Sequence, residues 1–136
     1  MAYEYTAVSI DKSQGAIRKL MAAHGAINIT FASGSDPRME GFQATVTLDS
    51  KPYAIRIAVL VQNKENEKLQ DKENRRVWRV LYHHLKGAFV AADEGVIDIR
   101  ELLLSFLVTK DGRTVGQRVL KDMSKLIEAP RQAFLE

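Results

Sequence analysis

The densest cluster of positive charge in the sequence lies between positions 72 and 86. Most of its residues follow one another at spacings of four, three, four and three, which place side chains on one side of a helix. The planar guanidinium of arginine can bind two phosphate oxygens, and each neutralised phosphate releases counterions. The pattern therefore predicts a face that binds DNA or RNA, formed by Lys72, Arg75, Arg76, Arg79, His83 and Lys86.

Two other interpretations of this basic face stay open. Most charged helix faces are simply solvated, and nearby acidic residues can pair with the arginines. The acidic residues in question are Glu65, Glu67, Asp71 and Glu73. A charged face can also contact a protein partner. The nucleic-acid interpretation requires that the cationic side chains emerge together into water, with Tyr82 at their edge able to stack on an unpaired base.

Other residue types that support chemistry are not spaced for it. His83 and His84 are adjacent and so point about 100° apart on a helix, whereas zinc-binding helices place histidines four positions apart. Asp93-Glu94 has no second acidic group predicted beside it. The sequence has no Gly-rich phosphate-binding loop, no nucleophile motif and no cysteine. We therefore predict a non-enzymatic protein with no catalytic residue, no metal site and no cofactor.

Length and composition predict one globular domain covering residues 1–136. The chain is 46% hydrophobic and 27% charged, with a formal net charge of +3. Its N-terminus lacks the basic start and apolar run of a signal peptide. Its longest largely apolar run, 102–108, is far shorter than the ~20 residues of a membrane span. Together with the absence of cysteine, these features predict a cytoplasmic protein without a membrane partner.

The basic face needs a helix to carry it, and the preceding sequence predicts what that helix packs on. Residues 1–10 are predicted to form a short strand. Ser13 is suited to cap a helix over about 14–24, because its hydroxyl can accept a hydrogen bond from a first-turn amide. Gly25 is suited to end that helix.

Three runs then alternate apolar and polar residues with a period of two: 27–32, 43–48 and 54–61. Turn residues separate them at 34–37 and 49–52. Short turns make neighbouring strands antiparallel. The alternation predicts a sheet with one face on the core.

The segment 62–74 is polar and mixed in charge, which predicts an exposed loop. A long helix follows over about 72–93 and ends at Gly95. Its apolar stripe, expected to lie on the sheet, consists of Trp78, Leu81, Leu85, Ala88 and Ala92. Two shorter helices are predicted after it, one from Asp98 to Phe106 and one over about 114–128, separated by a turn at 110–113.

These elements predict an α+β fold. It has a helix, a three- or four-stranded antiparallel sheet, a long helix packed on one face, and two shorter C-terminal helices. The order of the first five elements is similar in layout to the double-stranded-RNA-binding domain. The same order also occurs in domains that bind no nucleic acid, so the layout alone predicts no function.

Several of these residues form a pattern that resembles an uncharacterised family of small proteins encoded by bacteriophages and prophages. The pattern consists of Arg75-x-x-Trp78-Arg79, Lys86, Gly95, Phe106 and the run Asp-Gly-Arg-Thr-Val-Gly at 111–116. The resemblance spans about 9–120. Gln117 and Arg118 depart from the Glu and Trp that are usual in the family. The resemblance implies a phage or mobile-element origin and a location in the host cell, and it implies no established activity.

The leading functional hypothesis is a phage accessory protein that binds nucleic acid through the basic face, largely without sequence preference. The alternative is a protein-interaction module, either an inhibitor of a host protein or a self-associating assembly factor that forms a homodimer. An exposed apolar patch of Ala54, Ala58 and Leu60 would favour a host or phage protein, or a second copy, as the partner.

Overall fold

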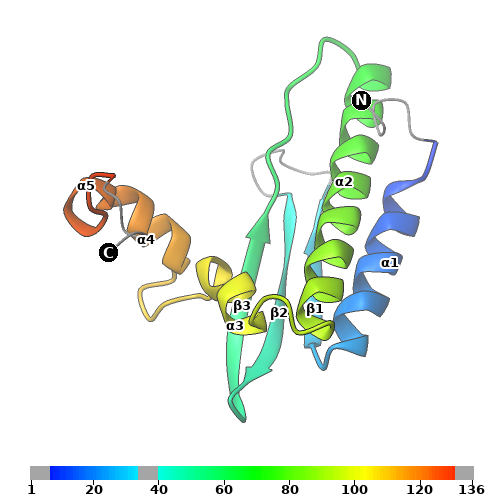
Figure 1. Ribbon diagram of the computed structural model, residues 1–136. Coiled ribbons are helices and arrows are strands. Elements are labelled where there is room, and N and C mark those ends of the chain that lie inside the picture. Colours follow the sequence, from blue (N-terminus) through cyan, green and yellow to red (C-terminus); the bar gives the residue numbers. More distant parts are fainter. Residues whose placement is uncertain (1–6, 34–39, 131–136) are drawn as a thin grey trace.

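Three antiparallel strands form one sheet in the order β1-β2-β3, and two helices lie on the same face of it (Figure 1). The computed structural model describes residues 7–33 and 40–130. The elements are α1 (Ile10–Ala23), β1 (Ile27–Ala32), β2 (Gly41–Leu48), β3 (Lys51–Ala58), α2 (Glu67–Asp93), α3 (Ile99–Leu103), η2 (Leu104–Phe106), α4 (Val115–Lys121) and α5 (Met123–Leu126). This order confirms the predicted α+β fold.

The alternation in β2 sets the orientation of the sheet. Phe42, Ala44, Val46 and Leu48 are buried, whereas the residues between them are exposed or half-buried. Since side chains alternate across a strand, the apolar set faces α1 and α2 and the polar set faces away. β3 runs from Lys51 to Ala58, so the predicted third run, 54–61, begins three residues after the start of the strand and ends three residues beyond it.

A two-residue turn joins β2 to β3. Leu48 pairs with Lys51, and the two residues between them, Asp49 and Ser50, have φ angles of 51° and 66°. Two consecutive positive φ angles are those of a type I′ turn, whose twist matches that of an antiparallel hairpin.

The first helix begins one turn earlier than the sequence predicts. Its cap is Ser9, whose side chain accepts a hydrogen bond from the amide of Lys12, whereas Ser13 lies inside the helix and is fully buried. The earlier start brings Ile10 against the core beside Ile17, and this burial favours the extra turn. The predicted cap at Ser13 is therefore wrong.

The strand predicted over residues 1–10 is not present at its described end. Residues 7–9 form no strand and Ile10 begins α1, while residues 1–6 lie outside the described part of the chain. The turn predicted at 34–37 also lies outside it.

The long helix α2 begins at Glu67, so the predicted loop over 62–74 ends at residue 66. Asn66 caps the helix by accepting a hydrogen bond from the amide of Leu69 over 3.0 Å. The first turns of α2 extend past the ends of the strands (Figure 1), where no apolar stripe is needed to cover the sheet. A polar sequence is therefore compatible with helix at this end, and the predicted loop boundary is wrong.

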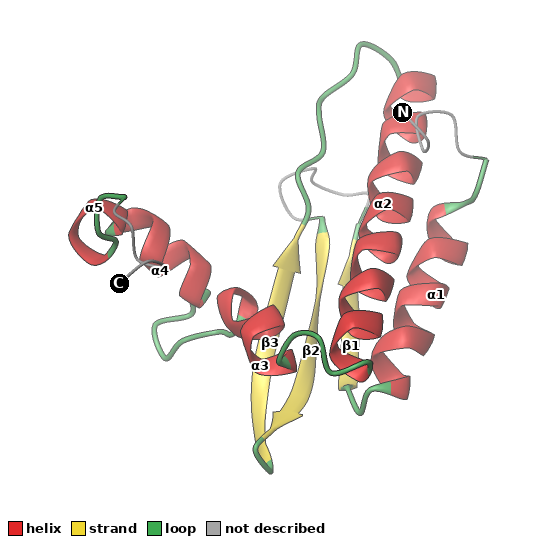
Figure 2. Cartoon of the chain, in the orientation of Figure 1, coloured by secondary structure: helices red, strands yellow, loops and turns green. Residues whose placement is uncertain are grey.

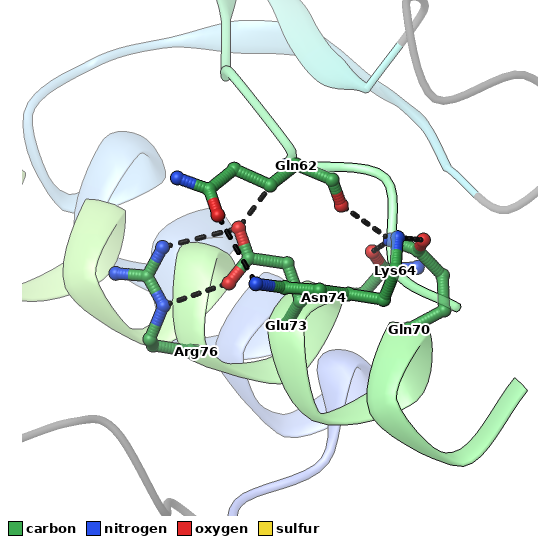
Figure 3. Close-up of polar contacts among 6 residues, drawn as sticks. All are labelled: Gln62, Lys64, Gln70, Glu73, Asn74 and Arg76. Carbon is green, nitrogen blue, oxygen red and sulfur yellow. Dashed lines mark hydrogen bonds and ion pairs between the residues drawn. The ribbon is translucent and has the colours of Figure 1, made fainter. Parts of the chain in front are cut away.

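A polar network fixes the loop before α2 onto its first turns (Figure 3). The side-chain amide of Gln70 donates to the backbone carbonyl of Gln62 over 3.0 Å. The backbone amide of Lys64 donates to the side-chain oxygen of Gln70 over 2.8 Å. The backbone amide of Gln62 donates to the carboxylate of Glu73 over 3.1 Å. These contacts order a segment whose composition alone is typical of a mobile loop.

Trp78 and Leu85 of the predicted stripe are buried in the core, as is Phe89, which the prediction omitted. Leu81 is only half-buried, because the buried side of α2 is turned toward Phe89 and α1. Trp78 is fully buried, and its indole Nε1 donates to the Glu40 carboxyl over 2.7 Å. The interpretation of the lone tryptophan as a core residue is confirmed.

The chain then crosses to the outer side of β3 and leaves the sheet. Leu107 pairs with Ile55, and the amide of Val108 donates to the carbonyl of Ala54 over 2.9 Å. A turn over 109–113 leads to α4, which Thr114 and Gln117 cap reciprocally. The predicted last helix is interrupted at Asp122, giving α4 and α5.

We call residues 104–127 the C-terminal arm. Figure 2 shows α4 and α5 standing apart from the layer formed by the sheet and the two long helices. Within the described residues, no helix combines the length and the apolar character needed to cross a bilayer.

Candidate interaction surfaces

The structure places all six cationic residues of the predicted basic face on α2. His83 and Lys86 are exposed. Lys72, Arg75, Arg76 and Arg79 are half-buried. The helix therefore presents the residues along one side, as the spacing predicts, but not all of their charge reaches water.

Two of the arginines are held by carboxylates of the same helix. Arg75 pairs with Asp71 over 3.1 Å, and Arg76 binds both oxygens of Glu73 over 2.9 and 3.1 Å (Figure 3). Glu73 is only 6% exposed, and the hydrogen bonds from Arg76 are the main reason that its pKa is lowered, against the effect of burial. The expectation that all six cationic side chains emerge together into water is therefore wrong, because Arg75 and Arg76 are paired with carboxylates of α2.

Arg79 lies against an aromatic ring instead of a carboxylate. Its guanidinium carbon is 5.0 Å from the centroid of the Tyr82 ring, a cation–π contact, and its Nε is buried without a hydrogen-bond partner in the described residues. The same Tyr82 ring contacts His83 at 5.1 Å. Tyr82 thus supports its neighbours on α2, and Lys72, Arg79 and Lys86 form no ion pair within the described ranges.

His24 joins the ends of the two long helices. Its Nδ1 donates to the Leu20 carbonyl over 2.8 Å, its Nε2 donates to the Asp93 carboxylate over 2.9 Å, and its ring stacks on Phe89 at 4.2 Å. Burial alone lowers the pKa of His24, but the Leu20 carbonyl and Asp93 outweigh it and raise the pKa above its usual value. Both ring nitrogens hold a partner only in the charged form.

A pocket of about 240 Å³ lies beside this histidine, between the ends of α1 and α2 and the end of β2. Its wall includes Met21, Val46, Phe89 and Leu103, which are apolar. Because both nitrogens of His24 are already bonded, the pocket offers no free imidazole for proton transfer. No group of three or more histidine, aspartate or glutamate side chains is placed to hold a metal ion within the described residues.

A second ionic cluster joins the hairpin to α3. Arg100 donates to Asp98 over 2.6 Å and to Asp49 over 3.1 Å. The hydrogen bonds from Arg100 lower the pKa of Asp98 to about 2. Asp98 also caps α3, so the cluster positions the start of the C-terminal segment.

Five large apolar side chains of the C-terminal arm are exposed. Leu104, Leu120, Met123, Leu126 and Ile127 are 52%, 66%, 44%, 61% and 57% exposed. Both α4 and α5 lie wholly within the described residues, and none of their side chains is buried. The sequence predicts an apolar side for this segment through Val115, Val119, Met123 and Leu126, but it does not show that the side stays uncovered.

A groove of about 380 Å³ runs along the arm where α4 meets α3 and η2. Leu104, Val115, Val119 and Leu120 line it, and Glu101 lies on its wall. The groove is open and mostly apolar, which is the character of a site for another side chain more than of a reaction site.

The remaining predicted patch lies on and beyond β3. Ala54 and Ala58 are exposed, and Leu60, which follows the strand, is 94% exposed. This exposure is the condition that favours a protein partner over nucleic acid.

Comparison of the chain with protein-family models, with curated proteins and with solved structures gives no match.

Proposed function

We propose that this chain is a protein-interaction module of phage or mobile-element origin that binds another protein chain through its C-terminal arm, without catalysis. One observation carries the proposal: α4 packs on the short η2 segment, yet no side chain of α4 or α5 is buried, so much of the apolar surface of these two helices stays exposed. A helix with an apolar stripe is stable when the stripe packs on a partner, and helices this short are marginal in water alone. Grouped exposed apolar side chains are typical of protein-binding surfaces.

A second candidate function is nucleic-acid binding through a reduced basic face. It is favoured by Lys72, Arg79 and Lys86, which have no ion pair in the described residues. The carboxylates bound to Arg75 and Arg76 weaken it, because those charges are already neutralised within α2. Fewer available cations mean fewer phosphate contacts and a weaker affinity.

A capture experiment separates the two functions. A tagged chain is used to retain partners from a lysate of host cells that also express an untagged copy, with and without nuclease. Two double variants that introduce glutamate serve as matched probes: Leu120→Glu/Leu126→Glu, which places charge on the apolar arm, and Lys72→Glu/Lys86→Glu, which reverses charge on α2. Lys86, Leu120 and Leu126 are exposed and Lys72 is half-buried near the polar start of α2, so the fold should tolerate these changes.

We expect protein capture that resists nuclease, persists in the α2 variant and disappears in the arm variant. Capture that disappears with nuclease, or in the α2 variant alone, would instead support nucleic-acid binding. Retention of no protein at all, or equal retention by the arm variant, would contradict the proposed function.

A further inference from the structure

The pocket of about 240 Å³ beside His24 is a distinct feature of this fold, because protein interiors leave few unfilled spaces larger than a water molecule. Side chains of α1, β2, α2 and α3 form its wall. Those that are at least nine-tenths buried include Met21, Val46, Phe89 and Leu103. An apolar cavity of about 150 Å³ holds one benzene molecule, so this pocket has room for a ring with a short substituent, roughly nine non-hydrogen atoms.

The polar groups on the pocket wall favour a ligand that donates hydrogen bonds. Both N–H groups of His24 already donate, one to the Leu20 carbonyl and one to Oδ2 of Asp93, so none is left for an anion. Oδ1 of Asp93 accepts no hydrogen bond within the described residues, and the Asp93 side chain is 62% exposed. The charged group left free beside the pocket is therefore a carboxylate oxygen, which accepts hydrogen bonds and attracts positive charge.

The two long helices add negative potential at the same place. Figure 1 shows that α1 and α2 run in the same direction and finish at one end of the sheet, and the last residues of both helices line the pocket. The C-terminal end of a helix carries a partial negative charge, and neither helix has a basic residue in its last turn. Among the described residues of the pocket wall only His24 can carry positive charge, and Asp93 neutralises it.

From these observations we propose that the pocket binds a small hydrophobic primary amine. Its apolar body lies among Met21, Val46 and Leu103, and its ammonium group donates to Oδ1 of Asp93. Burial of the body supplies most of the affinity, while the charge selects an amine over an acid of the same size. None of the lining residues belongs to the C-terminal arm, so the inference goes beyond the proposed function and does not depend on it.

NMR titrations of the purified full chain at low ionic strength test the ligand class with three probes of similar size: phenethylamine, phenethyl alcohol and phenylacetate. The amine is expected to bind with a Kd of about 1 mM or tighter, an affinity that roughly nine non-hydrogen atoms can supply. The alcohol keeps the body without the charge and should bind at least about 3-fold more weakly, the effect of one partly exposed charge pair. Phenylacetate should bind more weakly still, since Asp93 repels its carboxylate.

Two matched pairs of variants locate the site. Asp93→Asn should raise the Kd of the amine at least about 3-fold and leave that of the alcohol unchanged, whereas Glu94→Gln, at an exposed carboxylate outside the pocket wall, should leave both unchanged. Ala92→Leu places a larger side chain in the pocket and should abolish binding of both probes. Ala91→Leu, on the adjacent residue that does not line the pocket, should leave both Kd values unchanged. Circular dichroism and thermal unfolding verify that each variant folds.

The inference is overturned by a wild-type chain that binds no amine up to about 10 mM, or by an alcohol or acid that binds as tightly as the amine. It is equally overturned if folded Ala92→Leu or Asp93→Asn binds the amine as the wild type does. The arm variant Leu120→Glu/Leu126→Glu should keep the wild-type Kd for the amine. Loss of amine binding therefore leaves the proposed function standing, and loss of capture through the arm leaves the pocket standing.

Discussion

The hydrogen bonding of the buried Glu40 depends on Trp78, a residue far away in the sequence. The two side chains are 38 positions apart, and both are buried, with the indole donating to the carboxyl over 2.7 Å. A carboxyl group buried at this depth is stable only with hydrogen-bond donors around it. The tryptophan therefore stabilises the core in two ways: its side chain buries a large apolar area, and its indole N–H donates a hydrogen bond to Glu40.

Replacing Trp78 with phenylalanine removes the donor to Glu40 and part of the buried aromatic area. The smaller ring leaves Glu40 without this hydrogen bond and opens a small cavity, so we expect a loss of at least about 2 kcal/mol in the free energy of unfolding. Urea denaturation should show a lower midpoint with an unchanged slope. Leu60→Ala, at an exposed position, should be neutral. An unchanged midpoint for the phenylalanine variant would show that neither the hydrogen bond nor the lost area contributes to stability.

At the scale of elements, the start of α1 distinguishes a cap from an interior serine. We expect Ser9→Ala to reduce stability by about 1 kcal/mol, since it removes the acceptor for the amide of Lys12. Ser13→Ala should be neutral or stabilising, because the buried Ser13 hydroxyl has no hydrogen-bond partner in the described residues. Thermal unfolding of the two variants measures both effects, and the opposite ranking would restore Ser13 as the cap.

The joint between α1 and α2 should respond to pH. Because the folded-state pKa of His24 is raised, its pairing with Asp93 stabilises the fold fully below the unfolded-state pKa of about 6.5. This contribution is lost as the pH rises through the folded-state pKa. We therefore expect the stability difference between wild type and His24→Gln to be larger at low pH than at high pH.

Chemical denaturation at a series of pH values measures this difference. His84→Gln, which alters an exposed histidine of α2, is the matched control for the removal of an imidazole. Asp93→Asn should remove most of the pH dependence, since it removes the anionic partner. A wild-type profile that runs parallel to that of the His24 variant would contradict the assignment.

The helices and strands were largely predictable, because the spacing of apolar residues along each one indicates which of its sides is buried. The alternation around Val46 and the spacing around Trp78 follow directly from which side of each element meets the core. The choice between Ser9 and Ser13 was not predictable, because both are good caps and only the packing of Ile10 distinguishes them. The early start of α2 is not predictable from periodicity, because its first turns do not cover the sheet and so lack an apolar stripe.

The candidate sites were predictable only in part, for a different physical reason. Spacing places the cations on one side of α2, but it does not state which of them are neutralised. The pairing of Arg76 with Glu73 depends on the loop that buries that carboxylate through Gln62. Likewise, an apolar stripe at 115–126 is visible in the sequence, whereas its exposure depends on where the arm leaves the sheet.

At the scale of the whole molecule, the net charge of +3 leaves nucleic-acid contact as a measurable alternative. With the charges of Arg75 and Arg76 paired, we expect weak duplex DNA or RNA binding at about 50 mM salt, with a salt dependence of no more than about three released counterions. Gel-shift titrations over a salt series measure this slope. Lys72→Glu/Lys86→Glu should abolish the binding. A salt-dependence slope that corresponds to six phosphate contacts would show that Arg75 and Arg76 exchange their carboxylate partners for phosphates.

The short backbone pairing of Val108 with Ala54 has a practical consequence for anyone who trims this protein. The arm lies outside the layer of the sheet and the two long helices, but its first residues pair with the outer edge of β3. Deleting everything after α3 would leave main-chain amides and carbonyls of a hydrophobic sheet open to strands of neighbouring molecules. The shortened chain would then form aggregates through β-strand addition, and such material should not be mistaken for the native assembly.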